Sequence, residues 1–204
     1  MKNIGVILLT MVLIFTVGLF LNNMLAGEAG VGMAMALAGY TKVCGLQSGG
    51  MKTLYLVEVG DLTSFTLLAG EYTTATMTAA KVFKQYQFDQ DSFDLKEDVS
   101  IENNSMKVAH SIEFYLAKMG TVGRNAVEEI ALATACGMIA IAEDNNGTKW
   151  VLGYSENMKK TRPLELKTSA GTSGKKLTDA NGYTIKLESE DNESMHVYTG
   201  VIPV

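Results

Sequence analysis

The strongest constraint on the fold is an alternation of apolar and polar residues between Phe93 and Ala117. Successive side chains of a β-strand point to opposite faces, so a period of two predicts strands with one buried face. The residues on the apolar face are Phe93, Leu95, Val99, Ile101, Met106, Val108, His110, Ile112, Phe114 and Leu116. Those on the polar face include Asp94, Lys96, Asp98, Ser100, Lys107, Ser111 and Glu113. The turn-like residues Glu102–Ser105 interrupt the pattern, and we therefore expect one long hairpin.

Several shorter segments have the same character. The apolar residues begin to alternate after Gly49-Gly50, and they predict strands over Thr53–Val59 and Ser64–Leu68. A second hairpin is expected from Met138–Ala142 and Lys149–Tyr154, because the Asn146-Gly147 pair between them suits a turn with positive φ angles. The remaining expected strands are Tyr183–Glu190 and a short one through His196–Ile202.

One segment has the spacing of an amphipathic helix rather than a strand. In Thr121–Ala135 the apolar positions Val122, Ala126, Ile130 and Ala133 recur at helical intervals. Thr121 is the expected cap and Gly137 the expected end. The polar stretch Ser155–Ala180 predicts a long surface loop. The expected fold class is mainly β (α+β), with one helix packed on the sheet.

The N-terminus has a different composition. An uncharged run from Ile4 to Leu21 follows Lys2 and approaches the ~20 residues of a bilayer span, which predicts a hydrophobic helix. Three interpretations stay open: a membrane anchor, a removable signal, and an extension upstream of a functional start at Met33. Ala34, Ala36 and Ala38 are spaced like a signal-peptidase site, but they lie far behind an overlong apolar core.

These patterns divide the chain into three parts. The predicted domain organisation is a hydrophobic N-terminal segment (1–32), a linker or N-terminal arm (33–50) and a β-rich domain (51–204). A chain of 204 residues is compatible with one globular unit and an appendage.

The charge balance excludes one class of partner. With 17 basic and 22 acidic residues the net charge is −5, whereas proteins that grip nucleic acid need clustered Lys and Arg. Cys44 and Cys136 have no second Cys or His at metal-ligand spacing, so we predict two buried or idle thiols, with one disulfide as the alternative.

No motif predicts a catalytic, cofactor-binding or metal-binding residue. The run Gly171–Lys176 resembles a phosphate-binding loop, but Ser169 stands where the first Gly should be, Lys176 replaces Ser or Thr, and no helix pattern follows. The calcium-like spacing of Asp89, Asp91 and Asp94 lacks the Gly and the closing Glu of an EF-hand. We therefore expect no cofactor and no metal.

The other chemically suggestive residues have structural interpretations. His110 lies on an apolar face, where a satisfied core histidine is expected, and His196 has no paired nucleophile. Glu128 and Glu129 are expected to face solvent. A small hydrolase would need a nucleophile and a base that the sequence does not reveal, and we predict that the chain is not an enzyme.

The second hairpin carries a resemblance to a known family. The sequence IAIAEDNNGTKWVLGY (139–154), then a loop rich in Gly, Thr and Ser, then DANGYTIKL (179–187), resembles the tail-tube proteins of tailed phages that infect Bacteroidetes. The long hairpin from Ser92 to Ile112 also resembles the one that precedes the helix in those proteins, so the likeness covers roughly residues 45 to 190.

The resemblance implies a β-sandwich or barrel with one flanking helix, whose copies close into six-membered rings. Stacked rings would form a tail tube in the virion, through which double-stranded DNA passes without specific binding. Partners would be further copies of the chain and the tape-measure and tail-terminator proteins. Contacts between rings are expected from the Ser155–Ala180 loop and the Glu102–Ser105 hairpin tip. The alternative hypothesis is a membrane-anchored or secreted β-sandwich module for binding or assembly, motivated by Ile4–Leu21.

Overall fold

The computed structural model describes residues 39–42, 44–89 and 91–204. The chain divides into two units, Met1–Gly45 and Leu46–Val204, and the helix and strands reported below belong to the second. The interpretations of residues 1–32, including the hydrophobic helix, lie outside the described residues. Within the described part of 33–50 there is neither helix nor strand.

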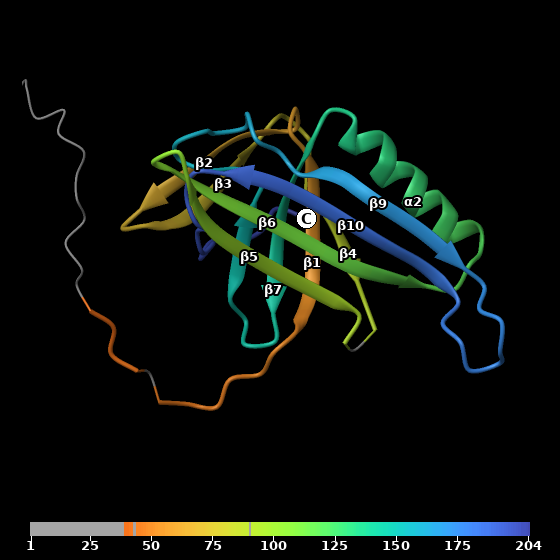
Figure 1. Cartoon of the computed structure of the whole chain (residues 1–204). Helices are drawn as coiled ribbons and strands as arrows, with labels where there is room; N and C mark the ends of the chain where they lie inside the picture. The colour runs from red at the N-terminus through yellow and green to blue at the C-terminus, as the bar shows by residue number, and fades with distance from the viewer. Residues whose placement is uncertain (1–38, 43, 90) are drawn as a thin grey trace, which may run out of the picture. The chain divides into compact units, whose positions relative to one another are not determined.

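The second unit is mainly β, as the alternation predicts. Its strands are β1 (Met51–Glu58), β2 (Leu62–Leu68), β3 (Glu71–Met77), β4 (Lys84–Gln87), β5 (Phe93–Glu102), β6 (Ser105–Ala117), β7 (Met138–Asp144), β8 (Lys149–Leu152), β9 (Glu165–Thr172) and β10 (Gly182–Asp191). Helix α2 (Thr121–Thr134) lies between β6 and β7 in the sequence. The strands form a first sheet in the order β4-β1-β7-β8, a second in the order β5-β6-β10-β9, and the separate β2-β3 pair (Figure 1).

The predicted long hairpin is confirmed. Strands β5 and β6 pair antiparallel from Phe93 opposite Phe114 to Glu102 opposite Ser105. Asn103 and Asn104 have φ of 50° and 60°, in the left-handed region that Asn tolerates better than most residues. These two residues close the turn where the alternation breaks.

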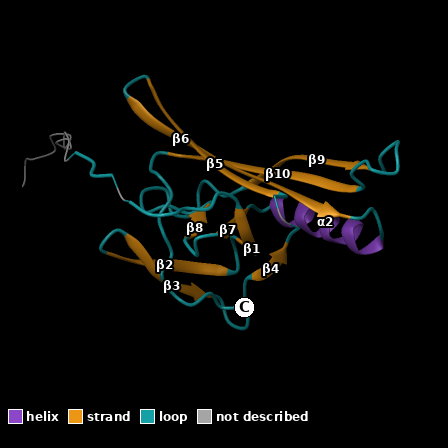
Figure 2. Ribbon diagram, turned by 90° about the horizontal axis from the view of Figure 1, so that it is seen from below, coloured by secondary structure: helices purple, strands orange, loops and turns teal. Residues whose placement is uncertain are grey.

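The outer part of this hairpin differs from the prediction. Val99, Ile101 and Met106 were expected to be buried, but they are 56%, 77% and 42% exposed. Figure 2 shows the reason, since the hairpin extends beyond the rest of the domain. Only its base reaches the core.

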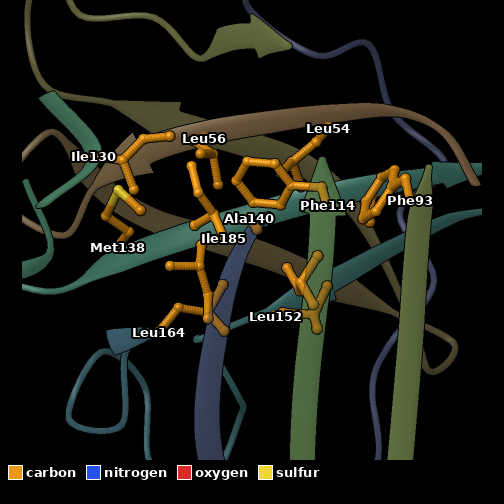
Figure 3. Packing of buried hydrophobic residues seen from close by; sticks show 13 residues of the cluster. Leu54, Leu56, Phe93, Phe114, Ile130, Met138, Ala140, Leu152, Leu164 and Ile185 are labelled. Atoms are coloured by element: carbon orange, nitrogen blue, oxygen red, sulfur yellow. The ribbon is translucent and has the colours of Figure 1, made fainter. Parts of the chain in front are cut away.

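The two four-stranded sheets share one hydrophobic core. Leu54 and Leu56 of β1 point toward Phe114 of β6 and Ile185 of β10, and Ile130 of α2 closes the same cluster (Figure 3). All of these side chains are at most 3% exposed. Burial of each large apolar side chain stabilises the fold by roughly 1.5 to 3 kcal/mol, so this core accounts for much of the sheet-to-sheet attachment.

The opposite face of the first sheet has a second core. Val57, Ile139, Ile141 and Val151 pack there against the β2-β3 hairpin and the C-terminal segment. The covering side chains are Leu62, Phe65, Tyr72, Tyr198 and Ile202. Strand β7 is consequently buried on both faces, which explains its uninterrupted apolar sequence.

Two predictions about the helix region are wrong in detail. The cap of α2 is Gly120 rather than Thr121, and no side chain caps the helix. Val122 was expected on the buried face but is 85% exposed. The buried residues of the helix are Ile130 and Thr134.

The predicted loop Ser155–Ala180 is wrong, because it contains strand β9. This strand pairs only with β10, and apart from the half-buried Leu166 its residues are exposed, so its polar sequence lacks the alternation of a half-buried strand. Strands β3 and β4 were also not predicted. The segment His196–Ile202 forms isolated bridges at Val197 and Tyr198 rather than the expected strand.

The second hairpin is confirmed, with a different turn. Only Gly147 of the Asn146-Gly147 pair has a positive φ, at 85°. The Asp144 carboxylate accepts hydrogen bonds from the amides of Asn146 and Thr148, both at 2.8 Å. The Asp side chain therefore organises the turn, and left-handed backbone is needed at one residue only.

Substitutions at two glycines can separate the contribution of core packing to stability from that of turn geometry. Gly147 (φ 85°) has open space around it, whereas a Cβ on Gly153 (φ 75°) would lie 2.6 Å from the Met138 carbonyl oxygen and 2.9 Å from the Leu164 amide nitrogen. Gly147→Ala should lower the free energy of unfolding by ~1 to 2 kcal/mol, the cost of left-handed backbone. Gly153→Ala should lower the free energy of unfolding by ~1 to 3 kcal/mol more than Gly147→Ala does, because its Cβ also overpacks the core. Urea denaturation measures both, and equal losses would refute the packing described at Gly153.

Candidate assembly surface

The outer face of the second sheet is charged. Residues that alternate with the buried positions of β5, β6 and β10 point away from the core. The charged ones are Asp94, Asp98, Glu102, Glu113, Glu188 and Glu190, with Lys96, Lys107 and Lys186. Six carboxylates against three ammonium groups give the outer face of these three strands an excess of three negative charges.

Ion pairs organise part of this charged face. Lys96 contacts Asp94 at 2.6 Å, Lys107 contacts Glu190 at 2.8 Å, and Lys186 contacts Glu188 at 2.7 Å. A hydrogen bond from the Lys107 ammonium lowers the pKa of the Glu190 carboxyl. Exposed pairs of this kind contribute little stability. Their effect is to keep the face charged and hydrated, so it is unsuited to burial against an apolar partner.

The second sheet also has long free edges. Strands β5 and β9, of 10 and 8 residues, are its terminal strands, and each pairs on one side only within the described chain. The edges of the first sheet differ. One edge strand, β4, has only 4 residues, and the outer edge of the other, β8, is hydrogen-bonded to the segment around Val197. Unpaired backbone donors and acceptors on a strand edge are a template for pairing with another chain.

The protruding part of the hairpin forms a further feature, which we call the hairpin arm (Val99–Lys107). Its exposed apolar residues Val99, Ile101 and Met106 lie on one face, and Val99 and Ile101 are opposite Val108 and Met106 in the register. Glu102 stands at the tip and is exposed. Contiguous exposed apolar side chains beyond a core are typical of a contact surface.

A hollow lies at the other end of the second sheet, which we call the end hollow. It has a volume of about 680 Å³ and is bounded by the β4-β5 connection, the end of β6 and the first turns of α2. Apolar lining comes from Phe88, Leu116, Val122 and Ala126, and the charged lining residues are Asp89 and Lys118. The first turn of α2 has no acidic residue and no side-chain cap.

A polar row, buried at His110 and Ser189 and half-buried at Glu97, crosses the inner face of the same sheet. Glu97 of β5, His110 of β6 and Ser189 of β10 are directly opposite one another in the strand register. Nε2 of His110 lies 3.3 Å from the Glu97 carboxylate, which also accepts a hydrogen bond from the Met195 amide at 2.7 Å. Sequence reasoning missed this row, and finding it requires the register of three strands.

His110 is buried in the core, as predicted, but it is not satisfied. It is 4% exposed, and neither ring nitrogen has a well-aligned hydrogen-bond partner among the described residues. The contact with Glu97 at 3.3 Å is therefore not a well-formed hydrogen bond. Burial lowers the pKa of His110, and the nearby carboxylates of Glu97 and Asp191 only partly oppose that effect.

Ser, His and Glu are the residue types of a nucleophilic triad. The Ser189 hydroxyl is unbonded among the described residues, and the residue is 7% exposed. A triad requires a hydrogen bond from nucleophile to base and access for a substrate. Ser189 makes no hydrogen bond to His110, and both residues are buried away from a substrate. The row is therefore better described as a titratable histidine inside the core.

The loop that resembles a phosphate-binding motif binds its own carboxylate. Asp179 accepts hydrogen bonds from the amides of Lys175 and Lys176, both at 2.8 Å, and these bonds lower the pKa of its carboxyl. Amides in this part of the loop are thus occupied by a side chain of the chain itself.

The remaining candidates are on the surface. Glu128 and Glu129 are exposed, as predicted, and Glu128 lies 3.7 Å from Arg124. Cys44 and Cys136 are free thiols as predicted, but they are exposed rather than buried. His196 contacts the Gly70 carbonyl oxygen at 2.9 Å. No group of acidic, His or Cys residues in the described ranges, Asp89, Asp91 and Asp94 included, has the arrangement of a metal site.

Comparisons with known proteins gave no relatives. A scan against protein-family models found no match, and searches of curated proteins and of solved structures also found none. Among the helices of the described residues, none is long and apolar enough to cross a membrane.

The buried histidine predicts an acid-sensitive fold. Because the pKa of His110 is lower in the folded chain than the ~6.5 of an exposed histidine, the unfolded chain binds a proton first as the pH falls. The free energy of unfolding should therefore be highest above about pH 6.5 and should decrease below it. His110→Gln should flatten this dependence between about pH 7 and 5, whereas His196→Gln, at the other histidine, should preserve it. Urea titrations at several pH values measure this, and an unchanged slope in His110→Gln would contradict the assignment.

Proposed function

We propose that this chain is a structural subunit of a phage tail tube, in which copies close into rings, the rings stack, and double-stranded DNA passes through the bore. The observation that carries the proposal is the second sheet, which has one charged face and two long free edges. The resemblance of residues 45 to 190 to tail-tube proteins also supports the proposal.

Edge-to-edge pairing of these sheets is geometrically consistent. The order β5-β6-β10-β9 is antiparallel throughout, so its two edge strands run in opposite directions. When β9 of one copy lies beside β5 of the next, the new pair is also antiparallel. Neighbouring strands are then antiparallel all the way around the ring, and closure removes every free edge of this sheet.

The dimensions of such a ring suit a conduit. Six copies of the sheet supply ~24 strands, and at ~4.8 Å per strand with a tilt of ~40° the backbone cylinder is ~50 Å across. Barrels of only ~16 to 18 strands already leave an aqueous channel. The cylinder therefore has ample room for a nucleic acid duplex.

The charged face of the second sheet is the proposed lining of the bore. Its excess of carboxylates repels phosphates, so that DNA would slide rather than bind. The first sheet, α2 and the β2-β3 hairpin would form the outer wall. In this proposal the protein belongs to the virion tail, where the tape-measure and tail-terminator proteins implied by the resemblance would be its other partners.

Blocking one edge tests the proposal. Lysines on an edge strand oppose pairing, so Thr168→Lys with Ala170→Lys on β9 should reduce ring formation at least tenfold while the domain remains folded. The matched control, Ala131→Lys with Leu132→Lys, adds the same charge to exposed positions of α2 and should assemble normally. Sedimentation velocity and circular dichroism of the full-length variants measure assembly and folding. Equal assembly of both variants, or a wild-type chain that stays monomeric at every concentration, would reject the proposal.

A further inference from the structure

We infer that Asn146 is a site of spontaneous deamidation in the folded chain, and that its conversion to aspartate releases the segment Ser48–Gly50 from the domain. The inference goes beyond the proposed function, since neither step requires assembly. It rests on two features of the turn between β7 and β8. The turn contains an exposed Asn-Gly pair with open space around it, and its asparagine side chains bind the backbone of Ser48–Gly50.

The chain contains two Asn-Gly pairs, Asn146-Gly147 and Asn181-Gly182. Deamidation begins when the amide nitrogen of the following residue attacks the asparagine Cγ. Glycine favours this attack, because it has no side chain to hinder the approach and its backbone adopts many conformations. The two pairs are equivalent in sequence, and only their surroundings in the structure distinguish them.

The first pair has room to react. Asn146 and Gly147 are both exposed, and a Cβ built on Gly147 would meet no other heavy atom within 4 Å. The Gly147 amide donates a hydrogen bond to the Asp144 carbonyl oxygen at 3.1 Å, within the turn. Such a bond contributes little net free energy, because water can replace it. The Gly147 nitrogen can therefore become available without unfolding of a strand.

The second pair is held in the sheet. Gly182 is a buried residue of β10 and is paired with Ala117 on one side and Thr172 on the other. The side-chain oxygen of Asn181 accepts a hydrogen bond from the Met119 amide at 2.9 Å. Attack at Asn181 would require this end of β10 to separate from both neighbouring strands. The structure therefore protects Asn181 and leaves Asn146 open to the reaction.

The reaction at Asn146 needs only water. The Gly147 nitrogen gives its proton to a base in the solvent and forms a bond to Cγ, while the Cγ–Nδ2 bond breaks and Nδ2 leaves as ammonia with a proton taken from water. Water then opens the resulting succinimide ring to aspartate or isoaspartate, so the net reaction consumes one water and releases one ammonia. The Ser48 amide donates to Oδ1 of Asn146 at 2.9 Å, and negative charge develops on that oxygen during the attack.

The same side chain belongs to what we call the asparagine clamp, formed by Asn145 and Asn146. Nδ2 of Asn146 donates to the Ser48 carbonyl oxygen at 2.9 Å, in addition to the bond that Oδ1 accepts. Asn145 donates from its side chain to the Gly49 carbonyl oxygen at 2.7 Å and from its backbone amide to the Gly50 carbonyl oxygen at 3.2 Å. The clamp thus holds the segment that leads into β1 beside the β7-β8 turn (Figure 1).

Deamidation removes a donor from this clamp. An aspartate at position 146 can still accept from the Ser48 amide, but it has no hydrogen to donate to the Ser48 carbonyl oxygen. Two oxygens would then face each other without a proton between them, which is unfavourable. The new charge also lies close to the Asp144 carboxylate, which accepts a hydrogen bond from the Asn146 amide at 2.8 Å. Like charges at this separation repel, so the segment Ser48–Gly50 is released.

Ageing the full-length chain in mildly alkaline buffer, with and without urea, tests the modification. Peptide mass spectrometry follows the replacement of amide by carboxylate at each asparagine. In urea both Asn-Gly pairs should react at similar rates, because neither is then structured. In the folded chain Asn146 should react at least tenfold faster than Asn181, because Gly182 is held in the sheet. Folded protein in which Asn181 reacts as fast as Asn146, or in which Asn146 stays unmodified, would overturn the inference.

The variant Asn146→Asp, which has the product of deamidation, tests the clamp. Hydrogen exchange of the Ser48 amide should be at least threefold faster than in the wild-type chain, because the segment is less firmly held. The control Asn103→Asp adds the same charge at the exposed tip of the β5-β6 hairpin and should leave this exchange unchanged. Equal exchange in Asn146→Asp and wild type would overturn the release of Ser48–Gly50. Neither measurement depends on assembly, so a failure of the tube proposal does not affect them.

Discussion

The domain depends on the burial of strand β7 on both faces. Met138, Ala140 and Ala142 point into the core between the two large sheets, while Ile139 and Ile141 point into the core beneath the β2-β3 hairpin. An apolar strand of this kind is stable only when both faces are covered. The second sheet and α2 provide one cover, and the β2-β3 hairpin with the C-terminal segment provides the other. The domain therefore has three layers, and the first sheet, which contains β7, is the middle one.

This arrangement determines which surfaces are left for partners. The faces of β1 and β7 are both covered, and the outer edge of β8 is hydrogen-bonded by the segment around Val197. The second sheet needs only its inner face for the core. Its outer face, the edges of β5 and β9, and the hairpin arm are not used in holding the domain together. The proposed assembly uses these surfaces, so ring formation and stacking need not disturb the core.

Most elements that bury side chains were predictable from the sequence, but β3, which buries Tyr72, and the exposed β9 were not. The β5-β6 and β7-β8 hairpins have the apolar patterns of half-buried and fully buried strands. Strand β9 was missed because all of its residues except Leu166 are exposed, and the polar sequence around Thr168 and Ser169 is typical of a loop. Val99 and Ile101 alternate as buried residues do, but a pattern cannot show where the core ends. The row of Glu97, His110 and Ser189 depends on strand register, which alternation alone does not specify.

The most direct measurement of the central claim is an electron cryomicroscopy map of the particles formed by the full-length chain. The proposed function predicts a continuous cylindrical sheet in which β9 of one copy runs antiparallel to β5 of its neighbour at ~4.8 Å, with the charged face toward the bore. Copies joined through other surfaces, with the edges of β5 and β9 facing solvent, would contradict it.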